Sequence, residues 1–487
     1  MKRLTLVNVS QGFFKETIPL GLSSISGYLK QYAPPMEITL LDSNCQDIYQ
    51  SFKPTDIVGI SAVTQDIKNA IHFAEFVKSK SDVPVVLGGV HISTYLKLPE
   101  QFDVGVIGEG EDAMLELMSL SDFSIDNLKT VKGICYNEQG KTVFTESRPL
   151  ISKLDNIPIP DRDIANLDYY LQDRHVIPYH IGRTLTMITS RGCPFNCIFC
   201  STRVHWKKFR AFSAERVIEE IELLIKKYNV EIIHIFDDLF IADKKRLSKI
   251  HKYIVEKGIY KKVKFMCLVR SDMVDDSTMK MLKEMNVVVT GIGMESGCSD
   301  MLEYLKCRTT TINDNRRAIE LANRYNLPAM GSFMLGNPNE TEDELLETLK
   351  FVQGYRYSPF LIPLSYISTA FPGTEFWNYA KNKGINVEDF DNIVMDIPKK
   401  PEPLKKAPLL TDIPLDRFFP IVRLFAKETA YAEVKRRIFL PESFFSLIWA
   451  YLWGIHIERS IIRGIIEVTR IRHHFIKYRN LFSNSKG

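Results

Sequence analysis

Three cysteines fall within eight residues of this chain, in the stretch Cys193-Pro194-Phe195-Asn196-Cys197-Ile198-Phe199-Cys200. The stretch follows an apolar run at 185–190 that predicts a strand. Three thiolates on one short loop can bind three irons of a four-iron cluster and leave the fourth iron open to a small molecule. We therefore predict a [4Fe–4S] cluster bound by Cys193, Cys197 and Cys200.

Two other uses of these cysteines have to be weighed. A disulfide would leave one cysteine unpaired and would need an oxidising compartment, for which the sequence carries no signal. Zinc would need a fourth ligand, which His205 could supply, and the spacing alone does not exclude it. Spacing and position at a strand end favour the iron–sulfur cluster. The other five cysteines are scattered, which predicts buried thiols: Cys45, Cys135, Cys267, Cys298 and Cys307.

The eight-residue stretch resembles the C-x3-C-x2-C signature of the radical S-adenosylmethionine (radical SAM) superfamily. The resemblance implies that S-adenosylmethionine binds the open iron through its amino and carboxylate groups. It further implies that the reduced cluster splits the sulfonium, and that the deoxyadenosyl radical so formed abstracts hydrogen from a substrate.

The bulk composition is that of an ordinary globular protein. The chain has 487 residues, of which 45% are hydrophobic and 25% charged, and this length allows two to four domains. The net charge of +4 is too small to indicate nucleic acid as a partner. The N-terminal stretch has no long apolar segment, so we expect no secretory signal and a cytoplasmic protein.

Short apolar runs alternate with helical patterns in the N-terminal third. Helices are expected at 21–32 and 66–79, and strands at 4–9, 38–41, 57–60, 83–87 and 104–107. Near-continuous apolar strands between helices predict an α/β domain with a doubly wound, Rossmann-like parallel sheet over residues 1–150. Polar and glycine-rich loops follow these strands, at the edge where such sheets bind ligands. No loop carries G-x-G-x-x-G, which disfavours a dinucleotide.

This region resembles the cobalamin-binding domain that precedes many radical SAM cores. The motifs that carry the resemblance are Pro19-Leu20-Gly21-Leu22, Gly59-Ile60-Ser61 with Thr64, Leu87-Gly88-Gly89-Val90-His91 and Gly108-Glu109-Gly110-Glu111. The resemblance implies that Ser61 and Thr64 line the slot for the cobalamin tail. It also implies that Gly88 and Gly89 pass under the corrin or the tail, and it adds Gly108 to the cobalamin-binding residues.

The family pattern is not complete. The D-x-H-x-x-G motif of other cobalamin enzymes is absent from the loop after the first strand, which contains no histidine. A protein imidazole below the cobalt is therefore not expected from that loop. His91 is the substitute to consider, either as a cobalamin-binding residue or as an ordinary hydrogen-bonding histidine.

Two features join the N-terminal domain to the next one. Residues 133–144 alternate on both sides of Gln139-Gly140, which predicts a hairpin. Residues 154–163 carry two prolines among acidic residues and predict an extended linker. We place the domain boundary near residue 150 and the linker at 151–184, where His175 and His180 are expected to be ordinary loop histidines.

Strand–helix units repeat after the cysteine loop. Strands are expected at 232–236, 263–268, 287–294, 329–335 and 364–367, and a helix at 214–228 with Ser213 as its N-cap. Each strand ends in charged or glycine-rich residues, on the edge that is the catalytic face of a β/α barrel. Counted from the cysteine strand, six units predict a partial barrel over residues 185–400.

Three strand-end segments resemble those that bind S-adenosylmethionine in the superfamily. The resemblance assigns Asp237 and Asp238 to its amino group, Glu295 and Ser296 to its ribose or methionine end, and Gly336 and Glu340 to the adenine side.

Structural interpretations of these carboxylates remain open. Asp237 or Asp238 could cap the next helix. Glu295 could pair with Arg270 across the barrel. Glu340 could be a surface carboxylate or a helix-start residue.

The last segment, 401–487, is expected to be a helical region after a charged, proline-bearing linker at 399–406. Its apolar stretch Phe444–Ile457 contains Trp449 and Trp453 and is too short to span a bilayer. Basic residues dominate the end. The segment could be a helical cap on the barrel or a peripheral contact with an anionic membrane surface.

The resemblance implies a cobalamin-dependent radical SAM enzyme that methylates an unactivated carbon or a phosphorus atom of a lipid, peptide or natural product. Its cofactors would be a [4Fe–4S] cluster, S-adenosylmethionine and cobalamin, with flavodoxin or ferredoxin as electron donor. A cyclase or rearrangement enzyme of the same architecture is the first alternative. A cobalamin or redox sensor with a structural cluster is the second.

Transfer-RNA methylthiolation, whose core motifs look similar, is disfavoured. It would need three further cysteines in the N-terminal domain, and the chain offers only Cys45 and Cys135 before the cluster loop.

Overall fold

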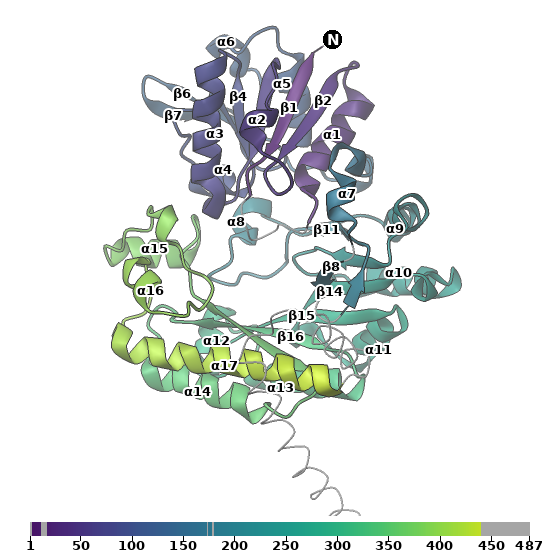
Figure 1. The fold of residues 1–487 in the computed structure, drawn as a ribbon, viewed down its shortest axis with the longest axis vertical. Coiled ribbons are helices and arrows are strands. Elements are labelled where there is room, and N and C mark those ends of the chain that lie inside the picture. The colour runs from purple at the N-terminus through teal and green to yellow at the C-terminus, as the bar shows by residue number, and fades with distance from the viewer. Residues whose placement is uncertain (1, 11–16, 173, 178–179, 440–487) are drawn as a thin grey trace, which may run out of the picture.

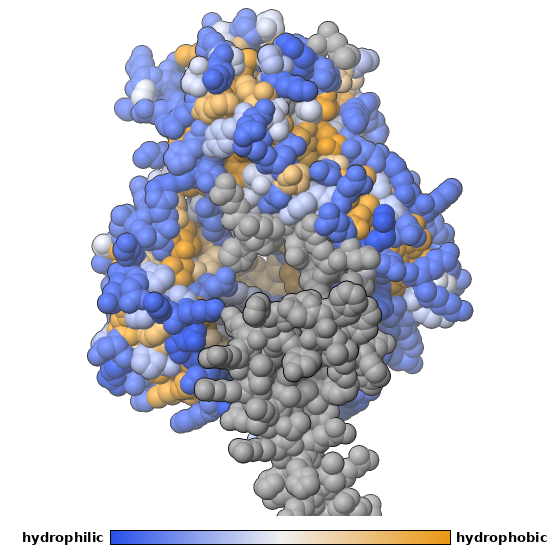
Figure 2. Space-filling view, in the orientation of Figure 1, coloured by the Kyte–Doolittle hydropathy of each residue, from blue (hydrophilic) through white to orange (hydrophobic). Residues whose placement is uncertain are grey.

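The structure is a computed structural model that describes residues 2–10, 17–172, 174–177 and 180–439. It contains two α/β units, each built on its own parallel sheet (Figure 1). On the face shown in Figure 2, hydrophilic residues cover most of the surface outside the grey atoms. None of the described helices combines the length and apolar character needed to cross a bilayer.

The N-terminal sheet has the strand order β2-β1-β3-β4-β5-β6-β7. Its parallel strands are β1 (Arg3–Asn8), β2 (Glu37–Asp42), β3 (Ile57–Ser61), β4 (Val85–Gly88) and β5 (Val104–Val106). The expected hairpin forms as β6 (Ile134–Glu138) and β7 (Lys141–Phe144), which extend this sheet in antiparallel fashion.

Helices cover both faces of this sheet, as expected of a doubly wound fold. Residues of α1 (Leu20–Tyr32) and α5 (Glu111–Ser119) pack with one face, and residues of α3 (Ile67–Lys80) pack with the other. The shorter helices are α2 (Ile48–Ser51), α4 (Val90–Tyr95) and α6 (Ile125–Leu128). The strand order reverses between β1 and β3, which is where open α/β sheets bind ligands.

The second sheet contains six parallel strands in chain order, as predicted. They are β10 (Thr184–Met187), β13 (Ile232–Ile235), β14 (Lys264–Arg270), β15 (Val287–Glu295), β16 (Ala329–Leu335) and β17 (Leu361–Ile367). Among the described residues β10 and β17 do not pair, so the barrel is open. Its helices are α9 (Ala214–Tyr228), α10 (Lys244–Glu256), α11 (Asp276–Glu284), α12 (Ser299–Leu305), α13 (Ile312–Arg324), α14 (Glu342–Gly354) and α15 (Glu375–Asn382).

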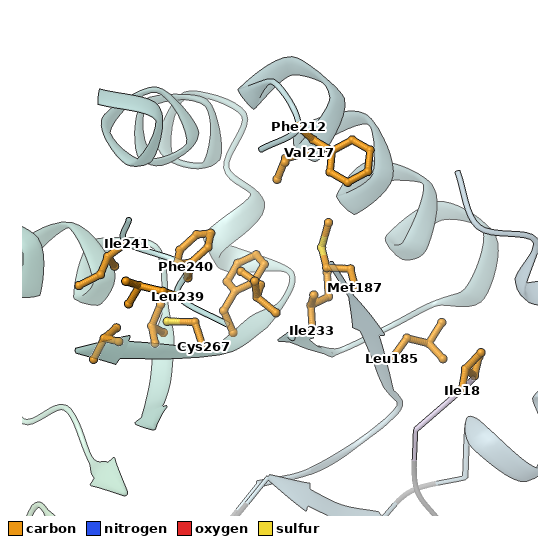
Figure 3. Packing of buried hydrophobic residues seen from close by; sticks show 14 of the residues in the cluster. Ile18, Leu185, Met187, Phe212, Val217, Ile233, Leu239, Phe240, Ile241 and Cys267 are labelled. Atoms are coloured by element: carbon orange, nitrogen blue, oxygen red, sulfur yellow. The ribbon is translucent and has the colours of Figure 1, made fainter. Parts of the chain in front are cut away.

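Apolar packing between strands and helices holds this second unit together. Met187 of β10 and Ile233 of β13 belong to one buried cluster with Val217 of α9 (Figure 3). Helix α9 begins and ends where its periodicity predicted, and the Ser213 hydroxyl accepts a hydrogen bond from the Arg216 N–H as its N-cap.

The segment between the two units is not the extended linker that its prolines suggested. It contains two short 3-10 turns, η2 (Leu154–Asn156) and η3 (Arg162–Ile164). Arg162 is fully buried and donates to Glu220 of α9 at 2.6 Å and to the Thr186 carbonyl at 2.9 Å. A buried ion pair thus holds this segment against the second unit, and the prediction of an extended linker is wrong here.

The C-terminal region is helical where the structure describes it, as expected. The linker predicted at 399–406 is wrong, because α16 (Glu402–Lys406) forms there and buries Leu404. Helix α17 (Leu415–Phe439) follows and packs along α14 and β17 (Figure 1). The apolar stretch at 444–457 and the basic end lie outside the described residues, so the membrane and cap interpretations stay predictions.

The cysteines outside the cluster loop differ in burial. Cys135, Cys267 and Cys298 are buried as expected, but Cys45 is half-buried and Cys307 is exposed. The prediction of a buried thiol is wrong for Cys307, because this residue lies in a surface turn after α12.

Candidate functional site

The three signature cysteines lie on one loop between β11 (Ser190–Arg191) and α8 (Thr202–Trp206). All three are free, half-buried thiols, and burial raises the pKa of Cys193 to about 11. Binding to a metal would stabilise the thiolate form of such a thiol. The donor set therefore fits an iron–sulfur cluster.

The structure gives less support to the binding of a single metal ion, such as zinc, by these cysteines. The described residues contain no group of three His, Cys, Asp or Glu side chains arranged around one metal ion. The thiolates of a four-iron cluster bind different irons and need not meet at one point. His205 packs against Trp206 and lines a cavity of the N-terminal domain, so the structure gives no support to zinc.

Arg270, at the end of β14, is the cation beside this loop. Its Nη1 donates to Cys197 Sγ at 3.1 Å, and its guanidinium lies 3.8 Å from the ring centroid of Phe195. Bonds to Asp272 at 2.6 Å and Thr310 at 2.7 Å fix its orientation. Hydrogen bonds to cluster sulfurs tune the reduction potential of an iron–sulfur cluster, so Arg270 is placed to do so here.

Asp237 and Asp238 follow β13 and take different places. Asp237 is buried and accepts four hydrogen bonds, from the backbone N–H and the hydroxyl of both Thr189 and Ser190, at 2.5–3.1 Å. Asp238 is exposed and accepts from Gly192 N at 3.2 Å and Thr202 Oγ1 at 2.9 Å. Neither caps the next helix, whose N-cap is Asp243. Both carboxylates instead fix the two ends of the cysteine loop.

Glu295 ends β15 in a left-handed conformation, with φ of +59°. Its carboxylate pairs with Lys306 at 2.9 Å, so the suggested pairing with Arg270 is wrong. Ser296 is buried, and its hydroxyl lies 2.9 Å from Thr348 Oγ1 and accepts from Cys298 N. Glu295 thus keeps a charged partner at the strand-end edge, while Ser296 is occupied by protein contacts.

Glu340 is not a surface residue, since only 2% of it is exposed. It accepts from Gly336 N at 2.7 Å and Asn337 N at 3.0 Å, and the helix after it is capped by Thr341. Burial raises the pKa of Glu340 to about 7. The surface and helix-start interpretations are therefore wrong, and Glu340 shapes the loop after β16.

A cavity of about 250 Å³ opens at the carboxyl edge of the N-terminal sheet, at the β1–β3 reversal. Six glycines line it: Gly21, Gly59, Gly88, Gly89, Gly108 and Gly110. A Cβ on Gly89, whose φ is +99°, would lie 2.6 Å from the Ala62 carbonyl oxygen. Only glycine fits there. Backbone and apolar walls of this kind suit the flat nucleotide tail of cobalamin.

The expected cobalamin residues divide into two groups. Ser61, Gly88, Gly89 and Gly108 line this cavity. Thr64 and His91 do not line it; both are buried, and the His91 Nδ1 lies 3.2 Å from Thr64 Oγ1. Burial lowers the pKa of His91 to about 4, and its ring packs against Tyr95 and Phe390.

Residues of the second unit close the cavity. Arg191, His205 and Trp206 line it beside Glu109 and Glu111. Arg191 pairs with both carboxylates at 2.5 Å. Burial alone would raise the pKa of Glu111, but the charge of Arg191 brings it below its ordinary value. Arg191, two positions before Cys193, thus connects the cysteine loop to the cavity through its ion pairs with Glu109 and Glu111.

Comparison with known proteins agrees with this geometry. The family model of the radical SAM superfamily matches residues 187–352, and that of the B12 binding domain matches residues 12–118. An uncharacterized methyltransferase of Pyrococcus horikoshii, PH0819, is 32% identical over 78% of this chain and 83% of that protein. The chain belongs to the radical SAM superfamily. An anaerobic magnesium-protoporphyrin IX monomethyl ester cyclase of Rubrivivax gelatinosus is another relative, 28% identical over 85% of this chain and 75% of that protein.

Two solved structures share the fold of this radical SAM protein. TsrM from Kitasatospora setae, solved with cobalamin and a [4Fe–4S] cluster, has a TM-score of 0.63 and 16% identity over 79% of this chain and 76% of that one. OxsB, solved with aqua-cobalamin, has a TM-score of 0.62 and 19% identity over 98% of this chain and 72% of that one. The predicted fold class, family and cofactors are confirmed: the chain is a cobalamin-dependent radical SAM enzyme that uses a [4Fe–4S] cluster and S-adenosylmethionine.

Several residues of the site were not anticipated from the sequence. Arg191 directly precedes Gly192 and Cys193, so its position in the sequence was enough to place it beside the cysteine loop. Arg270 was expected only as a partner of Glu295, and Lys306 was not expected at all, because their partners Cys197 and Glu295 lie 73 and 11 positions away in the sequence. His205 was considered only as a zinc ligand.

Proposed function

We propose that this enzyme transfers a methyl group from cobalamin to an unactivated carbon or phosphorus atom of a lipid, peptide or natural-product substrate. The observation that carries the proposal is the direct connection between the cysteine loop and the glycine-lined cavity through Arg191. The 32% identical relative, described as a methyltransferase, supports the same reaction class.

The chain's own residues prepare this reaction by fixing positions. When bound, the cluster and S-adenosylmethionine supply a deoxyadenosyl radical, and cobalamin supplies the methyl group. Asp237 and Asp238 hold the cysteine loop, Arg270 donates to Cys197, and Glu295 with Lys306 offers a carboxylate at the same edge. Flavodoxin or ferredoxin would serve as the electron donor.

Cyclisation is the second reaction to test, because the Rubrivivax relative is a cyclase. The two reactions differ in their by-products. Methyl transfer would need one S-adenosylmethionine and one electron to form the radical, and a second S-adenosylmethionine and a second electron to restore methylcobalamin, with both electrons from the donor. Deoxyadenosine and S-adenosylhomocysteine should therefore accumulate together, whereas cyclisation gives deoxyadenosine without S-adenosylhomocysteine.

The test begins with anaerobic reconstitution of the full chain with iron, sulfide and hydroxocobalamin. Dithionite and S-adenosylmethionine are then added, and the nucleoside products are separated and quantified. Both products, and a Cys197→Ala variant that loses iron and forms no deoxyadenosine, would support the proposal. Deoxyadenosine alone would transfer the assignment to cyclisation or rearrangement. Absence of both products from the iron-loaded protein would favour a sensor with a structural cluster.

A further inference from the structure

His205 is a polar side chain of the glycine-lined cavity whose Nδ1 finds no hydrogen-bond partner in the part of the chain that the structure describes. It lies on α8, in the second unit, yet it lines the cavity of the N-terminal domain. Only 8% of the residue is exposed, and among the described residues its Nδ1 is buried without a hydrogen-bond partner. A buried nitrogen without a partner is costly, so such an atom in a residue that lines a cavity points to a hydrogen bond that a bound ligand can supply.

The neighbours of His205 explain why no protein group satisfies this nitrogen. Glu109, a carboxylate on the cavity wall, already accepts hydrogen bonds from Arg191, Arg210 and the Ile151 N–H. Burial lowers the pKa of His205 to about 4, so the imidazole is neutral at physiological pH and does not compete for that carboxylate as a cation.

The ring is also held in place. Its centroid lies 4.4 Å from that of Trp206 in an edge-on arrangement. The guanidinium carbons of Arg191 and Arg210 lie 5.4 and 5.9 Å from the Trp206 ring. A fixed imidazole loses little rotational freedom when it binds, which favours a specific hydrogen bond.

We infer that His205 anchors the nucleotide tail of cobalamin by a hydrogen bond between its Nδ1–H and a ribose or phosphate oxygen. The inference rests on the cobalamin-dependent function proposed above. The tail is favoured over the corrin because the cavity holds about 250 Å³ and its narrow, glycine-lined wall suits a flat group. Cobalt ligation is disfavoured because the nitrogen in question is Nδ1, next to the ring's attachment point, rather than the outer Nε2.

The geometry of the imidazole gives a set of matched variants. An asparagine amide reproduces the position of Nδ1, whereas a glutamine amide reproduces that of Nε2. We expect His205→Leu and His205→Gln to weaken hydroxocobalamin binding about tenfold or more, and His205→Asn to retain most of the affinity. His234→Leu is the control, because His234 is a mostly buried histidine of β13 that does not line this cavity.

Binding is measured on the full-length, cluster-loaded protein by absorbance titration, with cobalamin and with cobinamide, which lacks the nucleotide tail. The His205→Leu effect should vanish for cobinamide. Equal binding by wild type and His205→Leu would overturn the inference, as would an equal loss for cobinamide. Loss of nitrogen splitting from the Co(II) EPR spectrum of His205→Leu would also overturn it, in favour of cobalt ligation. Failure of the wild type to bind cobalamin would reject the cofactor assignment as well, whereas intact wild-type binding with an unaffected variant rejects His205 alone.

Discussion

At the scale of single residues, the buried carboxylates of the strand ends differ in how their charge is stabilised. Glu111 has a cation, Arg191, and its pKa is lowered despite burial. Glu340 accepts hydrogen bonds from two backbone N–H groups and a side-chain amide but forms no ion pair among the described residues, and burial raises its pKa to about 7. Position after a strand therefore does not by itself determine what a carboxylate does.

Replacement of Glu340 by glutamine should change how stability depends on pH. The pKa of Glu340 is about 7 in the folded protein, against an ordinary value of 4.5 for a glutamate, so folding favours the protonated form. Its contribution to stability is fully present below about pH 4.5 and is lost as the pH rises to about 7. The free energy of unfolding of the wild type should thus fall between pH 5 and 8, relative to Glu340→Gln, by up to about 3 kcal/mol.

Urea denaturation of the cluster-free protein at several pH values measures this difference. Asp343→Asn is the matched control, because Asp343 is an exposed carboxylate at the start of the same helix, α14. The plot of its unfolding free energy against pH should run parallel to that of the wild type. If the plot for Glu340→Gln is also parallel to the wild type, Glu340 is ionised in the folded protein across this pH range.

At the scale of elements, features that depend on neighbouring residues were predictable from the sequence, whereas contacts between residues far apart in the sequence were not. The apolar period and Ser213 defined α9 because both signals lie within the helix and its first turn. The strands were found because apolar runs report burial on both faces of a parallel sheet. Arg162 was missed because its partner Glu220 lies 58 positions away, and nothing local distinguishes a buried arginine from an exposed one.

The same limit applies to the candidate site. The cysteines were predictable because all three lie on one loop, and the glycine-rich strand ends were predictable because parallel strands share an edge. The roles of Asp237 and Glu340 as acceptors of backbone N–H groups depend on how loops fold back on them. Residue type and position do not contain that information.

Loss of the Asp237 carboxylate should loosen the cysteine loop. In Asp237→Ala, the buried N–H groups of Thr189 and Ser190 lose their acceptor, and we expect the free energy of unfolding to fall by about 2–5 kcal/mol. The amount of iron bound per chain after anaerobic reconstitution should fall as well. Asp237→Asn keeps one oxygen as an acceptor, so its free energy of unfolding and its iron content should fall less than those of Asp237→Ala.

Asp243→Ala separates this effect from general destabilisation. It removes the N-cap of α10, which costs about 1 kcal/mol, and leaves the loop contacts intact. Its iron content should match that of the wild type. Full iron content in Asp237→Ala would show that the loop holds the cluster without this carboxylate.

At the scale of the whole molecule, several sets of contacts among the described residues join the two α/β units. Tyr170 donates to Asp42 at 2.5 Å, and Asp161 contacts Ser26 and Lys30 of α1. Another set is the pairing of Arg191 and Arg210 with Glu109 and Glu111, in which Arg210 and both carboxylates are buried. Because these pairs also border the glycine-lined cavity, cofactor binding and the packing of the two units should depend on the same residues.

Removal of Arg191 tests that dependence. In Arg191→Met, Glu109 keeps Arg210, whereas Glu111 loses its cation and keeps the hydrogen bond from the Ser24 hydroxyl, at 2.8 Å. A buried charge left without its partner costs about 3–5 kcal/mol, so the melting temperature should fall and the single calorimetric transition should separate into two.

The double variant Arg191→Met/Glu111→Leu removes both charges and should recover much of the lost stability, because the destabilisation comes from the uncompensated carboxylate and not from the missing contact. Asp56→Asn, which breaks the exposed pair with Arg3 inside the N-terminal domain, should change stability by less than about 1 kcal/mol. Hydroxocobalamin affinity should fall in Arg191→Met and stay unchanged in Asp56→Asn. A single unshifted transition with full affinity in Arg191→Met would mean that the other contacts between the two units, such as those of Tyr170 and Asp161, hold them together instead.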